Sequence, residues 1–120
     1  MDIRPKTIFC DIDGVLVSHQ NAGVHAQMGD DVKILPGVIE TLYDWDLKGY
    51  QIILTTGRRE SLRTRTEEQL LGLGIYYDKL IMGVTGGERV VINDRKPNSR
   101  DDMAWSINVD RNEGLEGVNI

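Results

Sequence analysis

The chain has 120 residues, a length that suits one domain with a sheet and flanking helices and leaves little room for a second lobe. Its composition, with 40% hydrophobic and 28% charged residues, is typical of a globular protein. The net charge of -5 provides neither nucleic acid nor an anionic membrane with the basic face that each would need, although a bound cation can reverse the local field for an anionic substrate.

The cysteine usage and the N-terminal residues favour a cytoplasmic protein. Cys10 is the single cysteine, so the chain cannot form an internal disulfide. The first residues, "MDIRPKTIFCDIDG", lack the long apolar core of a signal peptide, and no window of the sequence approaches a membrane span. We expect Cys10 to be a small buried apolar side chain rather than a redox centre.

The first predicted element is a buried strand over residues 7–12, whose apolar sequence leads into two carboxylates, Asp11 and Asp13. Isolated charges are expensive to bury, so this pair needs a positive partner. Gly14 follows and allows the chain to turn. Residues 17–35 are polar, contain two glycines and show no clean period, so they predict a loop or a short flap.

Helix and strand signals alternate through the middle of the chain. Apolar residues recur at three-to-four spacing between Pro36 and Gly49, which predicts a helix with proline at its start and glycine at its stop. The segment "YQIILTT" (50–56) then predicts a second buried strand, and a second helix is expected from Arg59 to Gly72. Both helices would pack one face against the sheet.

Shorter signals complete the pattern toward the C-terminus. The segments "KLIMG" (79–83) and "ERVVIND" (88–94) predict a third and a fourth strand, and "SINV" (106–109) predicts a fifth after a short helix around 101–104. The alternation implies parallel pairing with right-handed crossovers. We therefore predict a single α/β domain over 1–120, built as a three-layer, Rossmann-like parallel sheet flanked by helices.

The carboxyl ends of the predicted strands form the expected ligand site, because ligands bind at that rim of a parallel sheet. The rim would gather Asp11 and Asp13, Thr55 and Thr56, and Asp94. Two like charges about 4 Å apart repel by on the order of 4 kcal/mol at an effective dielectric of 20. A magnesium ion, which prefers hard oxygen ligands, would offset this repulsion. The rim therefore predicts a magnesium site.

Three segments resemble motifs of the haloacid dehalogenase (HAD) superfamily. "DIDGVL" is similar to the first motif, an aspartate, one residue, an aspartate and a glycine, and "IILTTGR" is similar to the second, an apolar strand ending in threonine. "VVINDRKP" is similar to the fourth, an apolar strand ending in an acidic residue. The three follow the family order over residues 7–98. The resemblance implies a HAD-like fold, and the shortness of the insert 17–35 implies that it has no cap domain.

The resemblance also implies a role for each matched residue. Asp11 matches the nucleophile that takes the phosphoryl group. Asp13 matches the general acid/base, and its backbone carbonyl would also bind magnesium. Thr56 matches the hydroxyl that binds the transferring phosphoryl oxygens. Asp94 matches the acidic metal ligand, with Asn93 in the small-residue position before it.

Further residues beside these motifs are expected at the site. Thr55, Gly57 and Arg58 are expected to bind substrate. Thr55 is also the alternative to Thr56 as the residue whose hydroxyl binds the phosphoryl oxygens. The family usually places a lysine upstream of the fourth motif, where this sequence has none on the correct rim. We expect Lys96 to supply that cation. Arg58 is a second candidate on the same rim.

For several other basic and polar residues the sequence allows more than one role. Lys79 and Arg89 would stand at the starts of their strands, on the opposite rim. His19 and His25 lie in the polar insert, where they could touch substrate, although surface histidines are commoner. Residues 111–113 could fold over a neighbouring site, and a solvated tail end is the default.

The sequence as a whole predicts a cytoplasmic, magnesium-dependent phosphomonoesterase that acts through an aspartyl-phosphate. The stretches "LPGVIETLYDWDLKGYQIILTTGRRES" and "LIMGVTGGERVVINDRKPNS" resemble small phosphatases of capsule and lipopolysaccharide pathways, which implies a sugar phosphate or similar polyol phosphate as substrate. We expect a homo-oligomer in which a neighbour's flap or tail closes the pocket, and neither nucleic acid nor a membrane as partner. A nucleoside monophosphate phosphatase and a non-catalytic HAD-like binding domain are the alternatives.

Overall fold

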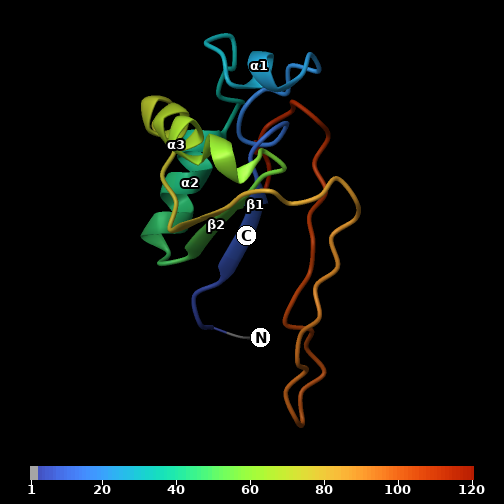
Figure 1. Cartoon of the computed structure of the whole chain (residues 1–120). Coiled ribbons are helices and arrows are strands. Elements are labelled where there is room, and N and C mark those ends of the chain that lie inside the picture. Colours follow the sequence, from blue (N-terminus) through green and yellow to red (C-terminus); the bar gives the residue numbers. More distant parts are fainter. Residues whose placement is uncertain (1–2) are drawn as a thin grey trace.

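The computed structural model describes residues 3–120 and contains a three-stranded parallel sheet packed against helices (Figure 1). In chain order the elements are β1 (Thr7–Asp11), α1 (Val24–Gln27), α2 (Val38–Leu47), β2 (Gln51–Thr55), a 3₁₀ turn (Glu60–Leu62), α3 (Arg63–Gly72) and β3 (Lys79–Ile81). The strands lie in the order β1-β2-β3, and both pairs are parallel. The predicted α/β alternation is therefore confirmed up to the third strand.

β2 occupies the centre of the sheet because its apolar side chains fill both faces. Ile52, Ile53 and Leu54 are all buried, as the continuous apolar run predicts for a strand with neighbours on both sides. In the register between β1 and β2, Asp11 stands beside Thr55. The carboxyl ends of the first two strands therefore meet at one rim, which positions the candidate site.

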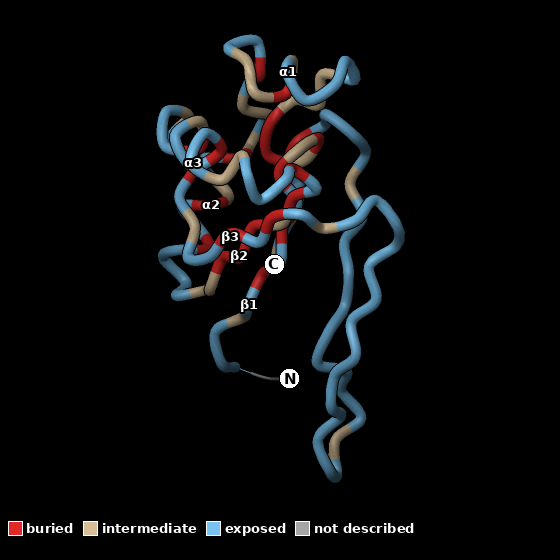
Figure 2. Tube along the Cα trace, in the orientation of Figure 1, coloured by how far each residue is buried: buried red, intermediate tan, exposed pale blue. Residues whose placement is uncertain are grey.

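The hydrophobic core lies between one face of the sheet and the helices α2 and α3. The helix predicted between Pro36 and Gly49 forms as α2 and begins two residues later than predicted, after Gly37 at a φ of 74°. Figure 2 shows the buried residues gathered between these layers. The sheet and the helices contribute these buried apolar side chains to the core: Ile8, Ile52, Leu54, Leu80, Val38, Leu42, Trp45 and Leu70.

The opposite face of the sheet is open, which differs from the predicted three layers. Phe9 and Ile81 lie on this face and are 62% and 44% exposed. Residues of β1 alternate strictly between buried and exposed, as in a strand that is covered on one side only. Among the described residues no helix covers this face, and the predicted strands at 88–94 and 106–109 do not join the sheet.

Residues 88–109 form an extended segment, called the arm below, that projects from the body of the molecule (Figures 1 and 2). The structure describes all of residues 82–120 and contains no helix or strand among them. The predicted fourth and fifth strands and the short helix around 101–104 are therefore wrong for this conformation. A strand needs a ladder of peptide hydrogen bonds to another segment, and among the described residues no such ladder reaches the arm.

The chain returns from the arm to pack on the body. The backbone N–H of Asn112 donates to the carbonyl of Gly14 at 2.8 Å, and that of Leu115 to the carbonyl of Pro36 at 2.9 Å. Leu115 is buried in the core. In the described residues, no helix has the length and apolar character needed to cross a bilayer.

Candidate active site

The turn after β1 separates the two carboxylates of the first motif. Asp11 is the last residue of the strand and is exposed, whereas Ile12 is fully buried beneath it. The carbonyl of Ile12 accepts backbone N–H groups from Leu16 at 2.9 Å and Val17 at 3.2 Å, and Gly14 turns the chain with a φ of 87°. This tight turn directs the next carboxylate, Asp13, toward the loop that follows β2.

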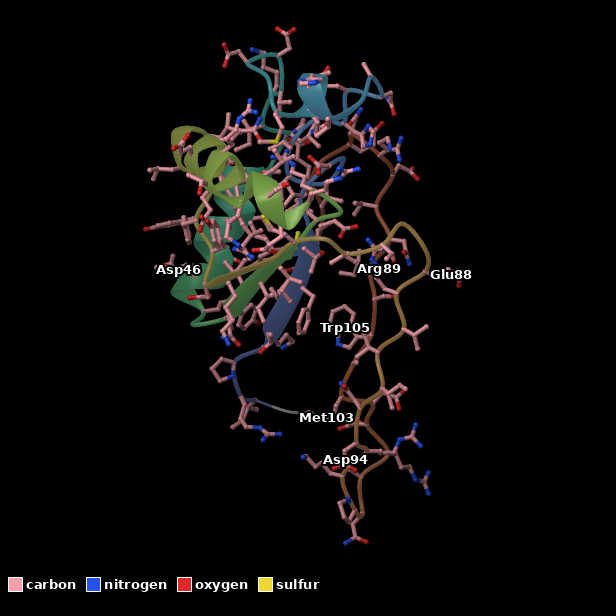
Figure 3. All side chains as sticks on the ribbon, in the orientation of Figure 1. Asp46, Glu88, Arg89, Asp94, Met103 and Trp105 are labelled. Atoms are coloured by element: carbon pink, nitrogen blue, oxygen red, sulfur yellow. The ribbon has the colours of Figure 1, made fainter. Side chains whose placement is uncertain are left out.

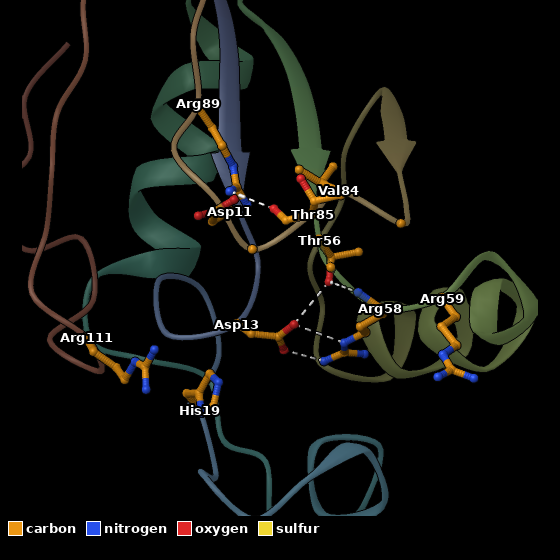
Figure 4. A pocket seen from close by; sticks show the side chains of 13 residues that line it. Asp11, Asp13, His19, Thr56, Arg58, Arg59, Val84, Thr85, Arg89 and Arg111 are labelled. Carbon is orange, nitrogen blue, oxygen red and sulfur yellow. Dashed lines mark hydrogen bonds and ion pairs between the residues drawn. The ribbon is translucent and has the colours of Figure 1, made fainter.

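Asp13 is the most strongly held side chain of the site (Figure 4). Arg58 donates to both of its carboxylate oxygens, from Nε at 3.2 Å and from Nη2 at 2.7 Å, in the forked geometry that suits a carboxylate. The Thr56 hydroxyl donates to Oδ2 at 3.1 Å. The amide of Gln27, from α1 in the flap, donates to Oδ1 at 2.7 Å. Three residues from two separate segments, the loop after β2 and the flap, therefore fix the orientation of this carboxylate.

Arg58 is itself buried, with a side-chain exposure of 3%. A buried guanidinium needs acceptors for its remaining donors, and Nη1 finds the Gln69 side-chain oxygen at 2.7 Å. The Gln69 amide in turn donates to the backbone carbonyl of Gln27 at 3.1 Å. The flap, the loop after β2 and α3 are thus connected by one hydrogen-bond network that is centred on the ion pair between Arg58 and Asp13.

Asp11 has very different surroundings. Its Oδ1 accepts the Thr55 hydroxyl at 2.7 Å, and among the described residues no donor reaches its other oxygen. The side chain faces a cavity of about 700 Å³. One carboxylate of the pair is therefore open to an incoming ligand, while the other is oriented by the protein.

The cavity brings four arginines near the two carboxylates in a chain with a net charge of -5. Its lining, drawn in Figure 4, consists of Asp11, Asp13, His19, Thr56, Gly57, Arg58, Arg59, Gly83, Val84, Thr85, Gly86, Arg89 and Arg111. Arg89 donates to the carbonyl of Thr85 at 2.9 Å and Arg111 to the side-chain oxygen of Asn21 at 2.7 Å. This concentration of cations suits an anionic ligand.

The structure brings together most of the residues expected from the first two motifs. Asp11, Asp13, Thr56, Gly57 and Arg58 all line the cavity. Thr55 lies next to them through its bond to the strand-end carboxylate. Thr56 is buried and its hydroxyl also accepts the backbone N–H of the second residue after it at 3.1 Å. The first two motifs therefore share one rim.

The residues of the fourth motif lie elsewhere. Asn93, Asp94 and Lys96 are on the exposed arm, where Lys96 Nζ is 3.7 Å from an oxygen of Asp94 (Figure 3). The structure does not bring Lys96 to the cavity. Lys79 begins β3, at the end away from the cavity, as expected. Arg89, expected on the opposite rim, lines the cavity instead, because no strand forms there to carry it away.

The arrangement does not by itself provide the predicted magnesium site. Among the described residues there is no group of three or more His, Cys, Asp or Glu side chains that could hold a metal ion. Both oxygens of Asp13 are engaged by Arg58, which is a cation. Of the two carboxylates at the cavity only Asp11 keeps a free side-chain oxygen, so the expected ligand set, which also includes the backbone carbonyl of Asp13, fits a magnesium ion only if Asp94 joins it.

Two other residues complete the description of the site. Burial, and secondarily the charge of Asp11, raises the pKa of the Cys10 thiol to about 12, so this cysteine stays protonated at neutral pH and is no nucleophile. Gln27 was missed by the sequence reasoning. A glutamine in a polar flap carries no signal of its own, since only the folded loop reveals that its amide reaches the carboxylate.

Comparisons with known proteins support the fold. No protein-family model and no curated protein matches the chain. Chains from two structures of the Pnkp1/Rnl/Hen1 complex, one of them described as an RNA repair complex, are similar to it with 32% identity and a TM-score of 0.57. The similarity covers 72% and 71% of this chain but only 30% and 28% of theirs, so this chain spans less than a third of their length.

A crystal structure of a Vibrio cholerae protein has 23% identity and a TM-score of 0.51, over 77% of this chain and 82% of that one. At this identity the similarity concerns the fold alone. It extends over most of both chains.

Proposed function

We propose that the chain is a phosphomonoesterase of the HAD type, in which Asp11 attacks the phosphorus of a phosphate ester. The observation that supports the proposal is that the two carboxylates at one cavity have different surroundings. Asp11 is exposed and keeps a free oxygen, while Asp13 is oriented by Arg58 and Thr56. Paired carboxylates in different environments are suited to the roles of nucleophile and acid/base.

The proposed reaction has two steps. An oxygen of Asp11 forms a bond to phosphorus as the bond to the leaving alcohol breaks, and Asp13 donates a proton to the departing oxygen. Water then attacks the aspartyl-phosphate, gives its proton to Asp13, and phosphate leaves with the carboxylate restored. The Thr56 hydroxyl and the arginines of the cavity stabilise the charge on the phosphoryl oxygens.

Magnesium remains part of the proposal. When bound, it would neutralise charge on the phosphoryl oxygens, with Asp11 and Asp94 as its carboxylate ligands and Asn93 beside them. In the present conformation Asp94 lies on the arm, so magnesium binding requires the arm to reach the cavity. In this conformation Arg58 and Arg89, which line the cavity, would take the role expected of Lys96 toward the phosphate.

Two substrate classes follow from different observations. A sugar or polyol phosphate rests on the sequence resemblance alone. A phosphate at the end of a nucleotide or an RNA strand is favoured by the similarity to chains of an RNA repair complex and by the four arginines, which exceed what one phosphate needs. We propose hydrolysis of a phosphate ester as the reaction. On these two observations, a nucleotide or RNA end is the second candidate substrate.

A panel of phosphate esters tests the proposal. Sugar phosphates, nucleoside monophosphates and short RNAs with a 5′- or 3′-phosphate are incubated with magnesium, with and without chelator, and released phosphate is measured. We expect release from at least one class, lost on chelation and reduced more than about a thousandfold in Asp11→Asn. Asp46→Asn, on the outer side of α2, is the matched control and should keep full activity. Undiminished hydrolysis by Asp11→Asn would exclude the proposed mechanism.

A further inference from the structure

Two residues that line the cavity, His19 and Arg111, form no hydrogen bond with either of its carboxylates. His19 belongs to the flap, and Arg111 to the segment that returns to the body after the arm. Both pack over Gly14, since the position that a Cβ on this glycine would take is 3.8 Å from Cβ of His19 and 3.3 Å from Cγ of Arg111. The bare backbone of Gly14 therefore leaves room for the two side chains beside the turn that carries Asp13.

Hydrogen bonds of Asn112 hold the two segments together at this point. The backbone N–H of Asn112 donates to the carbonyl of Gly14 at 2.8 Å. Its side-chain oxygen accepts the backbone N–H of His19 at 2.7 Å, and its side-chain amide donates to the carbonyl of the same residue at 3.3 Å. Asn112 has a φ of 65°, a left-handed conformation that asparagine adopts more readily than most residues. The backbone that carries Arg111 is therefore fixed next to His19.

Asn21 orients both side chains and leaves each of them with free donors. Its side-chain oxygen accepts a hydrogen bond from Nη1 of Arg111 at 2.7 Å, and its backbone N–H donates to Nδ1 of His19 at 3.0 Å. Because Nδ1 is the acceptor, the neutral imidazole carries its proton on Nε2. Among the described residues no acceptor bonds this Nε2 or the Nε and Nη2 atoms of Arg111, and the arginine forms no ion pair. Three donor atoms at the cavity therefore lack a protein acceptor.

The free donors of the His19–Arg111 pair suit a phosphate group. The Nε and Nη2 atoms form one edge of the guanidinium, an arrangement that binds two oxygens of an anion at once. The imidazole Nε2 adds a third donor, and a phosphate has three terminal oxygens to accept these bonds, whereas a carboxylate has two. Arg58 is already occupied by both oxygens of Asp13, so its charge is compensated within the protein. The charge of Arg111, in contrast, is available to a ligand.

The His19–Arg111 pair is separate from the place proposed for the reacting phosphoryl group. That group would lie at Asp11 and Thr56, and Figure 4 shows the pair on the opposite side of Asp13 from Thr56. Both places open into the same cavity of about 700 Å³. A volume of this size is typical of pockets that hold a whole small molecule, about 300–1,000 Å³. An anion at Arg111 would therefore belong to a different part of the ligand from the reacting phosphate.

We propose that the His19–Arg111 pair binds a second phosphate, carried by the leaving group of the ester that Asp11 attacks. The substrate is then a bisphosphate, of a sugar or of a nucleoside, rather than an ester with an uncharged leaving group. The place of the second phosphate on the leaving group rests on the proposed function. Its binding at the pair does not, because binding needs only the cavity and the free donors of His19 and Arg111.

Isothermal titration calorimetry without magnesium, in the presence of chelator, tests the second phosphate independently of any activity. Adenosine 5′-monophosphate is compared with adenosine 3′,5′-bisphosphate, and fructose 6-phosphate with fructose 1,6-bisphosphate. In at least one of these comparisons, wild type should bind the bisphosphate at least about tenfold more tightly than the monophosphate. The comparison that shows the preference identifies a nucleoside or a sugar as the carrier of the two phosphates. A ratio of dissociation constants near one in both comparisons overturns the proposal.

Three variants test whether these side chains cause the preference. Arg111→Gln should lower the ratio at least about fivefold, and His19→Phe, which keeps a ring without donors, at least about twofold. Arg65→Gln, on the exposed side of α3, removes the same charge outside the cavity and should keep the wild-type ratio. Partial unfolding changes the number of sites in the titration but not this ratio, so it cannot imitate the result. An unchanged ratio in Arg111→Gln, or an equal loss in Arg65→Gln, overturns the proposal, and an unchanged ratio in His19→Phe overturns the part assigned to His19.

Hydrolysis with magnesium tests the place of the second phosphate on the leaving group. The kcat/KM of the preferred bisphosphate should exceed that of its monophosphate at least about tenfold, and Arg111→Gln should lower this ratio by the same factor as the ratio of dissociation constants. A bisphosphate that binds through Arg111 but has the kcat/KM of the monophosphate overturns this part. If wild type releases phosphate from none of these esters or of the wider panel, the proposed function fails, and the titrations still decide whether the pair binds a second phosphate.

Discussion

At the scale of single residues, the ion pair between Asp13 and Arg58 governs the geometry of the cavity. The guanidinium is 3% exposed and the carboxylate 18% exposed, and each has further partners from the flap or α3. A buried charge of this kind is tolerated because its partners surround it, and its removal leaves the remaining groups unsatisfied. The network therefore positions a catalytic carboxylate and ties the flap to the body at the same time.

Replacing the guanidinium of Arg58 with a single ammonium group tests this role. Arg58→Lys keeps the positive charge but cannot contact both oxygens of Asp13 and also reach Gln69. We expect the free energy of unfolding in urea to fall by about 1–3 kcal/mol. The turnover number on an accepted ester should fall at least about tenfold, because Asp13 loses its orientation. Arg59→Lys changes the adjacent residue, which lines the cavity without bonding Asp13, and should alter stability by less than about 0.5 kcal/mol. Equal effects of the two substitutions would contradict the proposed role of the paired hydrogen bonds between Arg58 and Asp13.

Cys10 links residue chemistry to stability at alkaline pH. Its folded pKa is raised to about 12 from 9.0, mainly by burial. Above pH 9 the unfolded chain releases this proton and the folded chain retains it, so the free energy of unfolding falls as the pH rises. Between pH 9 and 10 this contribution amounts to about 1 kcal/mol. Urea unfolding of wild type and Cys10→Ala at both values checks it. The variant should lose less stability over this interval, and identical losses would show that the thiol has the same pKa in the folded and unfolded states.

At the scale of elements, the C-terminal segment is fastened to the start of α2 through a glycine that no other residue can replace. Gly114 has a φ of 81°, and a Cβ built there would lie 2.3 Å from the carbonyl oxygen of Pro36. The next residue, Leu115, is buried and bonded to the same carbonyl. Backbone conformation and close approach therefore both require glycine at this position.

Alanine substitutions distinguish this position from an ordinary glycine. Gly114→Ala should lower the free energy of unfolding by more than about 2 kcal/mol, since the left-handed backbone alone costs about 1–2 kcal/mol and the collision with Pro36 adds to it. Gly72→Ala, at the end of α3 with open space around it, should be neutral or stabilising by up to about 1 kcal/mol. Chemical denaturation of the two variants provides the comparison. A tolerated Gly114→Ala would mean that the C-terminal segment does not pack on Pro36 in solution.

The elements also show how far sequence patterns reach. β2 and α2 were predictable because their apolar residues find partners in neighbouring elements of the same chain. Residues 88–94 have an equally clear strand pattern. A strand, however, forms only when it pairs with a second segment, and the periodicity of the apolar residues does not specify which sheet edge is that partner. The rim positions of Asp11, Asp13 and Thr56 followed from the strand ends, whereas the contact of Gln27 depends on a loop conformation that no period encodes.

At the scale of the whole molecule, the distribution of charge matters more than its sum. The net charge of -5 argued against a nucleic-acid partner, yet four of the 14 basic residues line one cavity. Net charge describes the surface seen from a distance, while a ligand in the cavity experiences mainly the charges within a Debye length of about 8 Å. An acidic protein can therefore bind a strongly anionic ligand at a local concentration of arginines.

The salt dependence of hydrolysis measures how many phosphates this cavity contacts. If the substrate is an RNA end and two phosphates are engaged, raising NaCl from about 50 to 500 mM should lower kcat/KM roughly 25-fold, from a slope near -0.7 for each phosphate on a single strand. A sugar phosphate has no neighbouring phosphates and therefore no condensed counterions to release, so it should lose less than about fivefold. Arg111→Gln removes a cation at the edge of the cavity and should flatten the dependence for RNA while leaving that for the sugar phosphate nearly unchanged. The same slope for both substrates, unaffected by Arg111→Gln, would mean that the outer arginines contact no substrate and that one phosphate accounts for recognition.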